Sequence, residues 1–230
     1  MEDVSAATGF EFVFQPTPGS TVAGPRMFEF TGGGVGVLDY DLDGWPDLWM
    51  TQGRAWVAGQ TAPPHFAMRP QFYRNEGQGR FQELLASTLG PFFSREHLGR
   101  GLARLDWNRD GREDVAISHI GTPAALLENR TTVNGRFLSL TLVGRQSPRE
   151  PIGAVITANC GSRTLTKQLT AGDGYHASNQ GTLHFGLENA ESVDRLTVVW
   201  PSGVKSTTEN LAIDTEWQWI EGDIAPLRRP

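Results

Sequence analysis

Short apolar runs separated by turn residues dominate the second half of the chain. Each run is long enough for one strand, and the turn signals between them recur at intervals typical of a β-sandwich. The Asn134-Gly135 pair predicts a two-residue hairpin turn at the start of this region. We therefore expect a C-terminal β domain over residues 134–222, followed by a tail at 223–230. The expected strands are Phe137–Val143, Gly153–Ala158, Arg163–Leu169, Leu183–Phe185, Leu196–Trp200 and Glu216–Ile220.

The first half, residues 1–133, has a different pattern, in which a small-residue strand, an acidic loop and a second apolar strand occur twice. The two units span about residues 32–58 and 99–129, and their second strands are Leu48–Thr51 and Val115–Ser118. The pattern predicts an all-β fold with two propeller-blade-like repeats before the sandwich-like domain. The other expected elements are a half-buried strand through Phe10, Phe12 and Phe14, a loop over Ala58–Pro70, a strand and hairpin over Phe72–Phe81, and a short helix or loop over Leu84–His97.

The two acidic loops carry the candidate chemistry. Oxygen-bearing side chains crowded this closely repel one another unless a cation lies between them. Their alternate spacing, with a backbone carbonyl near position 7 and a glycine at position 6 for the sharp turn, is how a short loop wraps Ca²⁺. The glycines are Gly44 and Gly111. The predicted ligands are Asp39, Asp41, Asp43, Asp47 and the Trp45 carbonyl in one loop, and Asp106, Asn108, Asp110, Asp114 and the Arg112 carbonyl in the other.

The loops belong to an internal repeat, because Asp106 follows Asp39 by 67 residues and the flanking apolar positions match at the same offset. An EF-hand would place a bidentate Glu at position 12, where this chain has Met50 and Ile117. The flanks are also too short or too Gly-rich for the helices of an EF-hand. A plain solvated Asp-Gly turn explains one such loop but not two with matching flanks. We therefore predict two Ca²⁺ sites between β-strands.

Charge and composition limit the other functions. The formal net charge is −6, from 26 acidic and 20 basic residues, and the two loops account for much of the acidic excess. This balance argues against nucleic acid as a partner, for which a basic patch is expected. Cys160 has no second cysteine to pair with, and we expect a small, at least half-buried strand residue there. We expect neither a membrane span nor an N-terminal signal peptide in this sequence.

Several of these motifs resemble known repeats and domains. The strand–DxDxDGxxD–strand unit resembles the FG-GAP (VCBS) repeat, and Gln71–Phe81 is similar to that family's blade strand and hairpin, with a fainter copy at Ala125–Asn129. The C-terminal part resembles the ASPIC/UnbV domain of the CRTAC1-like family. The resemblance implies a secreted or envelope-exposed protein that binds or assembles. The motifs that match this domain are Ile152–Ala154, Leu169–Tyr175, Leu183–Leu187 and Val193–Gly203.

We expect a calcium-stabilised adhesion or assembly module, extracellular or in the cell envelope, rather than an enzyme. Two repeats are fewer than the four to eight blades of a closed propeller, so open strand edges could pair with other copies to give oligomers or filaments. The other expected partner is a cell-surface protein or glycan. Two alternatives are a carbohydrate-binding module and, more weakly, a Ca²⁺-assisted lyase or hydrolase. Tyr40 and Trp107 share one repeat position, which predicts a packing role for both. The five histidines show no metal-binding spacing.

Overall fold

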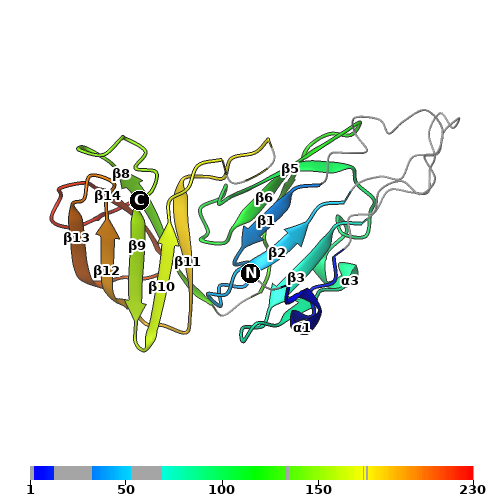
Figure 1. Cartoon of the computed structure of the whole chain (residues 1–230), viewed down its shortest axis with the longest axis horizontal. Coiled ribbons are helices and arrows are strands. Elements are labelled where there is room, and N and C mark those ends of the chain that lie inside the picture. The colour runs from blue at the N-terminus through cyan, green and yellow to red at the C-terminus, as the bar shows by residue number, and fades with distance from the viewer. Residues whose placement is uncertain are drawn as a thin grey trace, which may run out of the picture.

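The computed structural model describes residues 3–12, 33–52, 69–132, 135–172, 174 and 176–229. Within them the regular secondary structure is almost entirely β, in two halves that lie side by side (Figure 1). This confirms the predicted all-β class. The only helices in the described part are the single turns α1 (Ser5–Thr8) and α3 (Ala86–Leu89), and none is long and apolar enough to cross a membrane.

The N-terminal half contains two antiparallel sheets, one for each repeat. The first sheet has the order β1-β2-β3-β4 and the second the order β5-β6-β7. The acidic loops connect β1 to β2 and β5 to β6, so the prediction of a strand–loop–strand setting is confirmed. The strands are β1 (Val35–Leu38), β2 (Asp47–Met50), β3 (Gln71–Asn75), β4 (Phe81–Glu83), β5 (Gly99–Leu105), β6 (Asp114–His119) and β7 (Ala125–Leu127).

The two repeats use the same register around their loops. Leu38 pairs with Asp47 in the first sheet, and Leu105 pairs with Asp114 in the second. Because the first and ninth loop positions are fixed by these pairs, both loops must turn through the same number of residues. One shared core lies beneath the two sheets and is formed by Leu38, Trp49, Phe72, Phe93, Leu102, Val115 and Ile117.

The C-terminal half is a sandwich of two four-stranded sheets. One sheet has the order β10-β9-β12-β13, and the other has the order β11-β8-β14-β15, in which β8 and β14 are parallel. The strands are β8 (Arg136–Val143), β9 (Val155–Cys160), β10 (Arg163–Gln168), β11 (Thr182–Glu188), β12 (Val193–Val199), β13 (Lys205–Leu211), β14 (Thr215–Ile220) and β15 (Leu227–Arg228).

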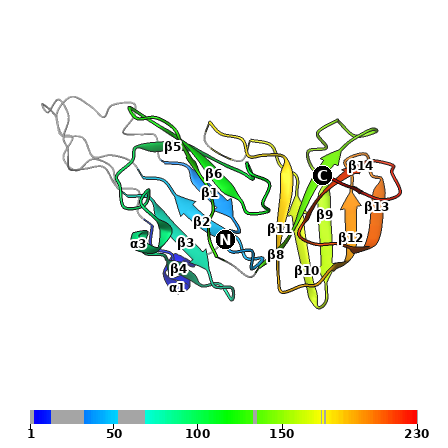
Figure 2. The same ribbon diagram turned by 180° about the vertical axis from the view of Figure 1, so that it is seen from behind.

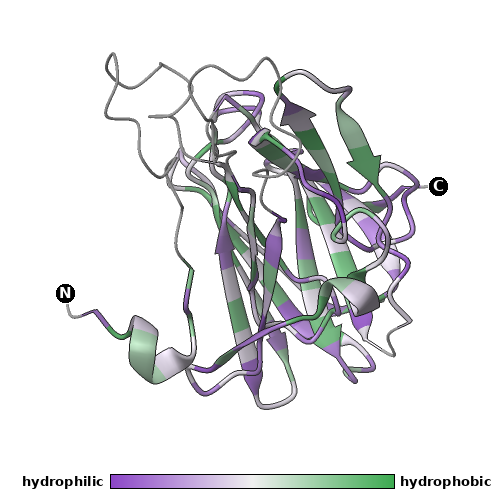
Figure 3. Cartoon of the chain, turned by 90° about the vertical axis from the view of Figure 1, so that its right-hand side faces the viewer, coloured by the Kyte–Doolittle hydropathy of each residue, from purple (hydrophilic) through white to green (hydrophobic). Residues whose placement is uncertain are grey.

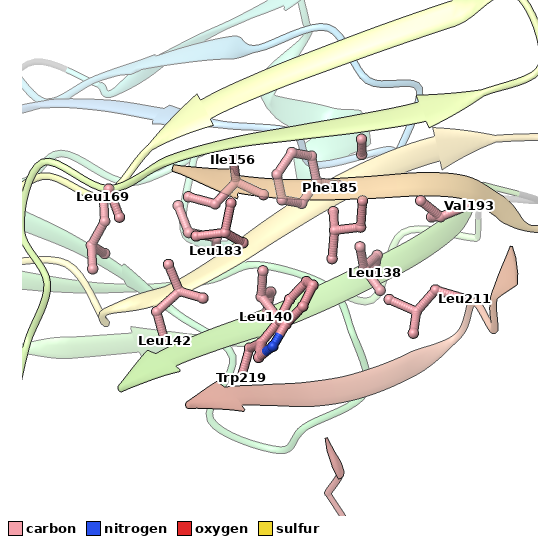
Figure 4. Close-up of a cluster of buried hydrophobic side chains, with 14 of the residues drawn as sticks. Leu138, Leu140, Leu142, Ile156, Leu169, Leu183, Phe185, Val193, Leu211 and Trp219 are labelled. Atoms are coloured by element: carbon pink, nitrogen blue, oxygen red, sulfur yellow. The ribbon is translucent and has the colours of Figure 1, made fainter. Parts of the chain in front are cut away.

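The sandwich core explains why the predicted strands form there. Apolar side chains that alternate along β8 and β9 point inward and meet the apolar residues of β11 and β12, as Figure 4 shows around Leu140 and Phe185. Polar positions fall between them, which gives the banding of the strands in Figure 3. Trp200 and Trp219 are buried to 1% and 0% exposure and close the core. Cys160 is a buried free cysteine in β9, as predicted.

Three predictions about individual elements were wrong, and one strand was missed. Phe10 and Phe12 do not lie in a strand, although Phe10 packs against Tyr73 at a ring-centroid distance of 4.9 Å; Phe14 lies outside the described residues. The strands around Asn134-Gly135 do not form a hairpin, because β7 and β8 belong to different sheets; Asn134 itself is not described. The supposed tail forms β15 against β14. The sequence analysis also missed β13, whose alternation is mostly polar.

Candidate metal centre

The first acidic loop gathers three carboxylates. One oxygen each of Asp39, Asp41 and Asp43 lies within 4.8 Å of the other two. Left-handed backbone at Leu42 (φ 59°) and Gly44 (φ 83°) folds the loop back over these side chains. Asp39 Oδ2 accepts the Gly44 N–H at 2.9 Å, which holds the turn closed. The loop therefore folds so that carboxylate oxygens from three of its residues converge.

The charge in this loop is poorly compensated by the protein. Oδ1 of Asp39 and Oδ1 of Asp41 are buried and have no hydrogen-bond partner. Burial raises the pKa of Asp39 to about 7, although the charge of Lys167 opposes the rise, and burial also raises the pKa of Asp41. Arg74 lies 2.8 Å from Asp41 Oδ2 without the alignment of a hydrogen bond. Orphaned carboxylate oxygens of this kind fit the donor set that Ca²⁺ prefers.

Asp47 and Asp114, at position 9, fasten the start of each loop to β3 in the first sheet and to the segment just after β7 in the second. Asp47 accepts the N–H of Tyr40 at 3.1 Å with one oxygen and that of Asn75 at 2.7 Å with the other. Asp114 repeats this arrangement with Trp107 at 3.2 Å and Asn129 at 2.6 Å. Burial raises the pKa of Asp47 to about 8. The structure thus gives position 9 a clamping role and does not bring Asp47 into the group of three carboxylates.

The second loop has the same backbone but satisfies more of its own polar atoms. Arg109 (φ 61°) and Gly111 (φ 86°) repeat the left-handed positions of the first loop. Asp106 accepts N–H groups from Asp110 at 3.1 Å and Gly111 at 2.9 Å, one with each oxygen. Asn108 Nδ2 donates to Asp110 Oδ2 at 3.0 Å, and the Arg112 guanidinium pairs with the same oxygen at 2.5 Å. This loop therefore needs a cation less than the first one does.

The carbonyl ligands predicted at position 7 belong to Trp45 and Arg112, whose side chains have different environments. The backbone N–H of Trp45 donates to Asp43 Oδ1 at 2.8 Å, and that of Arg112 donates to Asp110 Oδ1 at 2.9 Å. The Trp45 indole is 47% exposed. Arg112 instead turns its own guanidinium onto the loop, which supplies positive charge where the first loop relies on Arg74 of β3.

The first loop also contacts the sandwich. Glu188 donates its N–H to the Leu42 carbonyl at 2.9 Å, and Arg163 Nη2 donates to the Asp43 carbonyl at 2.9 Å. A Cβ on Gly186 would collide with Oδ2 of Asp39, so only glycine allows this approach. Figures 1 and 2 both show β11 on the side of the sandwich nearest the repeats. The loop is therefore part of the junction between the halves.

The second loop contacts the same sheet at β8 and β14. Arg109 pairs with Glu216 of β14 at 2.6 Å. A Cβ on Gly111 would collide with the ring of Phe137 in β8. Both acidic loops thus lie between the repeats and the sheet that contains β11, β8 and β14, so whatever fixes the loops also fixes the junction.

A buried ionic cluster lies between the two loops. Glu113 is 2% exposed; its Oε2 accepts the Asp39 N–H at 3.1 Å, and its Oε1 pairs with Arg104 at 2.5 Å. Burial alone would raise the pKa of Glu113, but the charges of Arg104 and Lys167 hold it below the ordinary value. Lys167 of β10 donates to the His184 carbonyl and lies 5.4 Å from the centre of the Phe185 ring.

Sequence reasoning did not find this cluster. Glu113 occupies position 8 of the second loop, where no ligand is expected, and Lys167 and His184 lie in strands with no motif of their own. Their one sequence signal is a charged residue inside an otherwise strand-like run.

Sequence reasoning was also wrong about Trp107: Tyr40 packs against Phe72 at 4.9 Å between ring centroids, as predicted, but Trp107 is 52% exposed.

Comparison with known families identifies the second half. Residues 144–226 match the model of the ASPIC and UnbV family, from the end of β8 to the residue before β15. The C-terminal half therefore contains an ASPIC/UnbV domain, as the sequence motifs predicted. Among curated proteins, none matches the chain.

Proposed function

We propose that this protein is a calcium-stabilised binding module in which two FG-GAP-like loops hold structural Ca²⁺. The observation that carries the proposal is the pair of buried, unpartnered oxygens on Asp39 and Asp41, which lie in a loop whose three carboxylates converge. Buried charge without a partner is costly, and a cation that removes this cost stabilises the fold.

The residues that would hold the ion follow from the loop geometry. Asp39, Asp41 and Asp43 supply carboxylate oxygens in the first loop, and Asp106, Asn108 and Asp110 occupy the matching positions in the second. Asp47 and Asp114 fasten each loop to its sheet through two backbone N–H groups. A bound Ca²⁺ supplies the positive charge that the first loop obtains only partly from Arg74. Because the loops touch β11, β8 and β14, occupancy would also stiffen the junction.

We place the protein outside the cell or in the cell envelope. Weak Ca²⁺ sites with few protein ligands fill where Ca²⁺ is millimolar. The family resemblance of the ASPIC/UnbV domain, at residues 144–226, implies the same location.

The test is a calorimetric titration of Ca²⁺ into the chelator-treated protein. We expect two bound ions for the wild type and one for Asp43→Ala. Glu150→Gln is the control, because Glu150 is exposed and lies between β8 and β9. Absence of binding to the wild type, or two ions on Asp43→Ala, would refute the proposal.

We propose a structural role rather than catalysis for the Ser139–His184 pair. Ser139 Oγ and His184 Nδ1 are 2.9 Å apart across β8 and β11, a spacing that a nucleophile and its base could share. Both residues are almost completely buried, at 2% and 5% exposure. This setting favours a structural hydrogen bond between neighbouring strands.

Self-association is a second candidate function, favoured by the edge of the second sheet. β7 is an edge strand, and Leu126 on it is 52% exposed. An apolar side chain on an unpaired edge invites pairing with another chain. Light scattering in Ca²⁺ should then show oligomers that Leu126→Lys dissociates, whereas a strictly monomeric wild type would exclude this candidate.

A further inference from the structure

A cavity of about 640 Å³ opens where the second repeat meets the sandwich. Its walls come from β5, the second acidic loop, residues 178–180, and strands β8, β11 and β14. This volume lies within the range of about 300–1,000 Å³ that small-molecule sites occupy. The cavity therefore has the size and the location, between two structural units, of a ligand site.

The cavity wall is held in place before any ligand arrives. Gln180 donates its N–H to the Arg104 carbonyl at 3.0 Å, and its Oε1 accepts the Asp106 N–H at 2.8 Å. Asn179 Oδ1 accepts the Arg104 N–H at 2.9 Å. The segment before β11 is thus pinned to β5 along its length, which reduces the ordering cost of binding.

Trp107 differs from its repeat counterpart in a way that packing does not explain. Tyr40, at the same position, is half-buried and in edge contact with Phe72. Trp107 lines the cavity and leaves 52% of its surface exposed. A large ring held at the mouth of a polar cavity offers an apolar face on which a flat ligand surface can stack.

The rest of the lining is rich in hydroxyl, amide and guanidinium groups. Ser178, Thr182 and Gln180 contribute uncharged donors and acceptors. Arg109 and Arg229 share Glu216, with bonds of 2.8 and 2.6 Å from Arg109 and 2.5 Å from Arg229. These three bonds use a minority of the donors of two guanidiniums, which have five N–H groups each. The trio therefore retains one net positive charge and spare donors for an acceptor. The other carboxylate of the lining, Asp106, already accepts the N–H groups of Asp110 and Gly111.

We infer that this cavity binds a saccharide that carries a carboxylate group, with its ring stacked on Trp107 and its carboxylate directed to Arg109 and Arg229. A sugar ring has an apolar C–H face for the indole and hydroxyl groups that both donate and accept, which matches the amides and hydroxyls of the wall. The surplus guanidinium charge selects the acidic sugar, since planar donors recognise carboxylates in pairs. The inference rests on the proposed function of a binding module and names the class of its ligand.

The test begins with an array of uronic-acid, sialic-acid and neutral oligosaccharides, probed with the Ca²⁺-loaded protein, followed by titration of the tightest one. We expect acidic oligosaccharides to bind and their neutral counterparts to bind at least tenfold more weakly. Trp107→Ala should lower the affinity tenfold or more. Leu85→Ala is the control, because Leu85 is 71% exposed and lies outside both the acidic loops and this cavity; it should bind as the wild type does.

Arg229→Gln tests the carboxylate contact separately. It should lower affinity for the acidic saccharide tenfold and leave the neutral counterpart unaffected. Absence of acidic saccharide binding, full binding by Trp107→Ala, or equal affinity for acidic and neutral saccharides would each overturn the inference. Melting curves with and without Ca²⁺ on the same samples separate the two hypotheses. A protein that responds to Ca²⁺ but binds no saccharide keeps the metal proposal and loses this one.

Discussion

The backbone N–H of Asp39 donates to Oε2 of Glu113 at 3.1 Å. The first residue of the first acidic loop is therefore hydrogen-bonded to a carboxylate of the second acidic loop. The other oxygen of Glu113 pairs with Arg104 of β5. Because Glu113 is 2% exposed, this contact is protected from water and its geometry is tightly defined. A change in either loop is therefore transmitted to its neighbour through one side chain.

Glu113→Gln should destabilise the protein and weaken calcium binding at both loops. The substitution removes the charge that balances Arg104 and Lys167 but retains an acceptor for Asp39. We expect a loss of about 3 kcal/mol, the low end for breaking a buried ion pair, because Arg104 is partly exposed. Chemical denaturation and calorimetry measure the two effects.

Glu128→Gln is the control for this prediction. Its partner Arg130 is 80% exposed, so the change should fall within about 0.5 kcal/mol. If Glu113→Gln weakened one site only, the two loops would be independent.

Asn108→Asp should strengthen the second site. The new carboxylate restores the charge that the first loop has at this position, and we expect roughly a tenfold gain in affinity, or about 1.4 kcal/mol. Without Ca²⁺ the same change loses the Asn108–Asp110 hydrogen bond and adds repulsion, so the melting temperature in chelator should fall. Asn210→Asp, an exposed position on β13, should change neither quantity. An unchanged second-site affinity would show that Asn108 faces no ion.

Glu221→Gln should destabilise the sandwich and alter its acid response. Glu221 is 1% exposed and accepts backbone N–H groups from Arg145, Gln146 and Ser147 at 2.7–2.8 Å. Burial alone would raise its pKa, but the hydroxyl of Ser202 and the donors of the 145–147 turn lower it to about 2.

The folded pKa of Glu221 is therefore below the unfolded value of about 4.5. Its contribution is present above that value and is lost as pH falls toward 2. We expect Glu221→Gln to cost about 1–3 kcal/mol at pH 7 and to flatten the acid limb of the stability curve, as measured by denaturation from pH 7 to 2. Wild-type acid sensitivity in the variant would show that other carboxylates dominate.

The stabilising effect of Ca²⁺ should grow as pH rises. Burial raises the pKa of Asp39 to about 7 and that of Asp47 to about 8. Without metal, the folded state keeps protons that the unfolded chain has lost, so stability declines from about pH 4 to pH 8. A bound cation favours the ionised form of both carboxylates, Asp39 as a ligand and Asp47 as a nearby charge, so the gap in melting temperature between Ca²⁺ and chelator should widen from pH 5 to 8. A gap that narrows with rising pH would contradict the assignment.

The sequence alone predicts the parts of this molecule whose structure is local. The loop between Leu38 and Asp47 repeats between Leu105 and Asp114, because the Asp-Gly spacing and flanking strands fix the same left-handed positions. The strands of the sandwich follow from alternating apolar residues. In both cases the signal lies within about ten residues, where side-chain period and turn chemistry decide the backbone.

The remainder depends on contacts between distant residues. Glu113 meets Asp39 only after the two repeats pack together, and it comes near Lys167 only after the two halves associate. No local pattern marks such a meeting. β13 was missed because its outward face is polar, and β15 because two residues carry no period. The different settings of Tyr40 and Trp107 likewise follow from the cavity beside the second loop, which the repeat does not encode.

Thermal unfolding in Ca²⁺, in excess chelator and in Mg²⁺ tests the central claim most directly. Two sites held at about 100 times their dissociation constants would add about 5 kcal/mol, which corresponds to roughly 10 °C or more for a chain of this size. We predict a fall of that order on chelation, full recovery with Ca²⁺ and little recovery with Mg²⁺, which demands a tighter octahedral shell. An identical melting temperature in Ca²⁺ and in chelator would contradict the account.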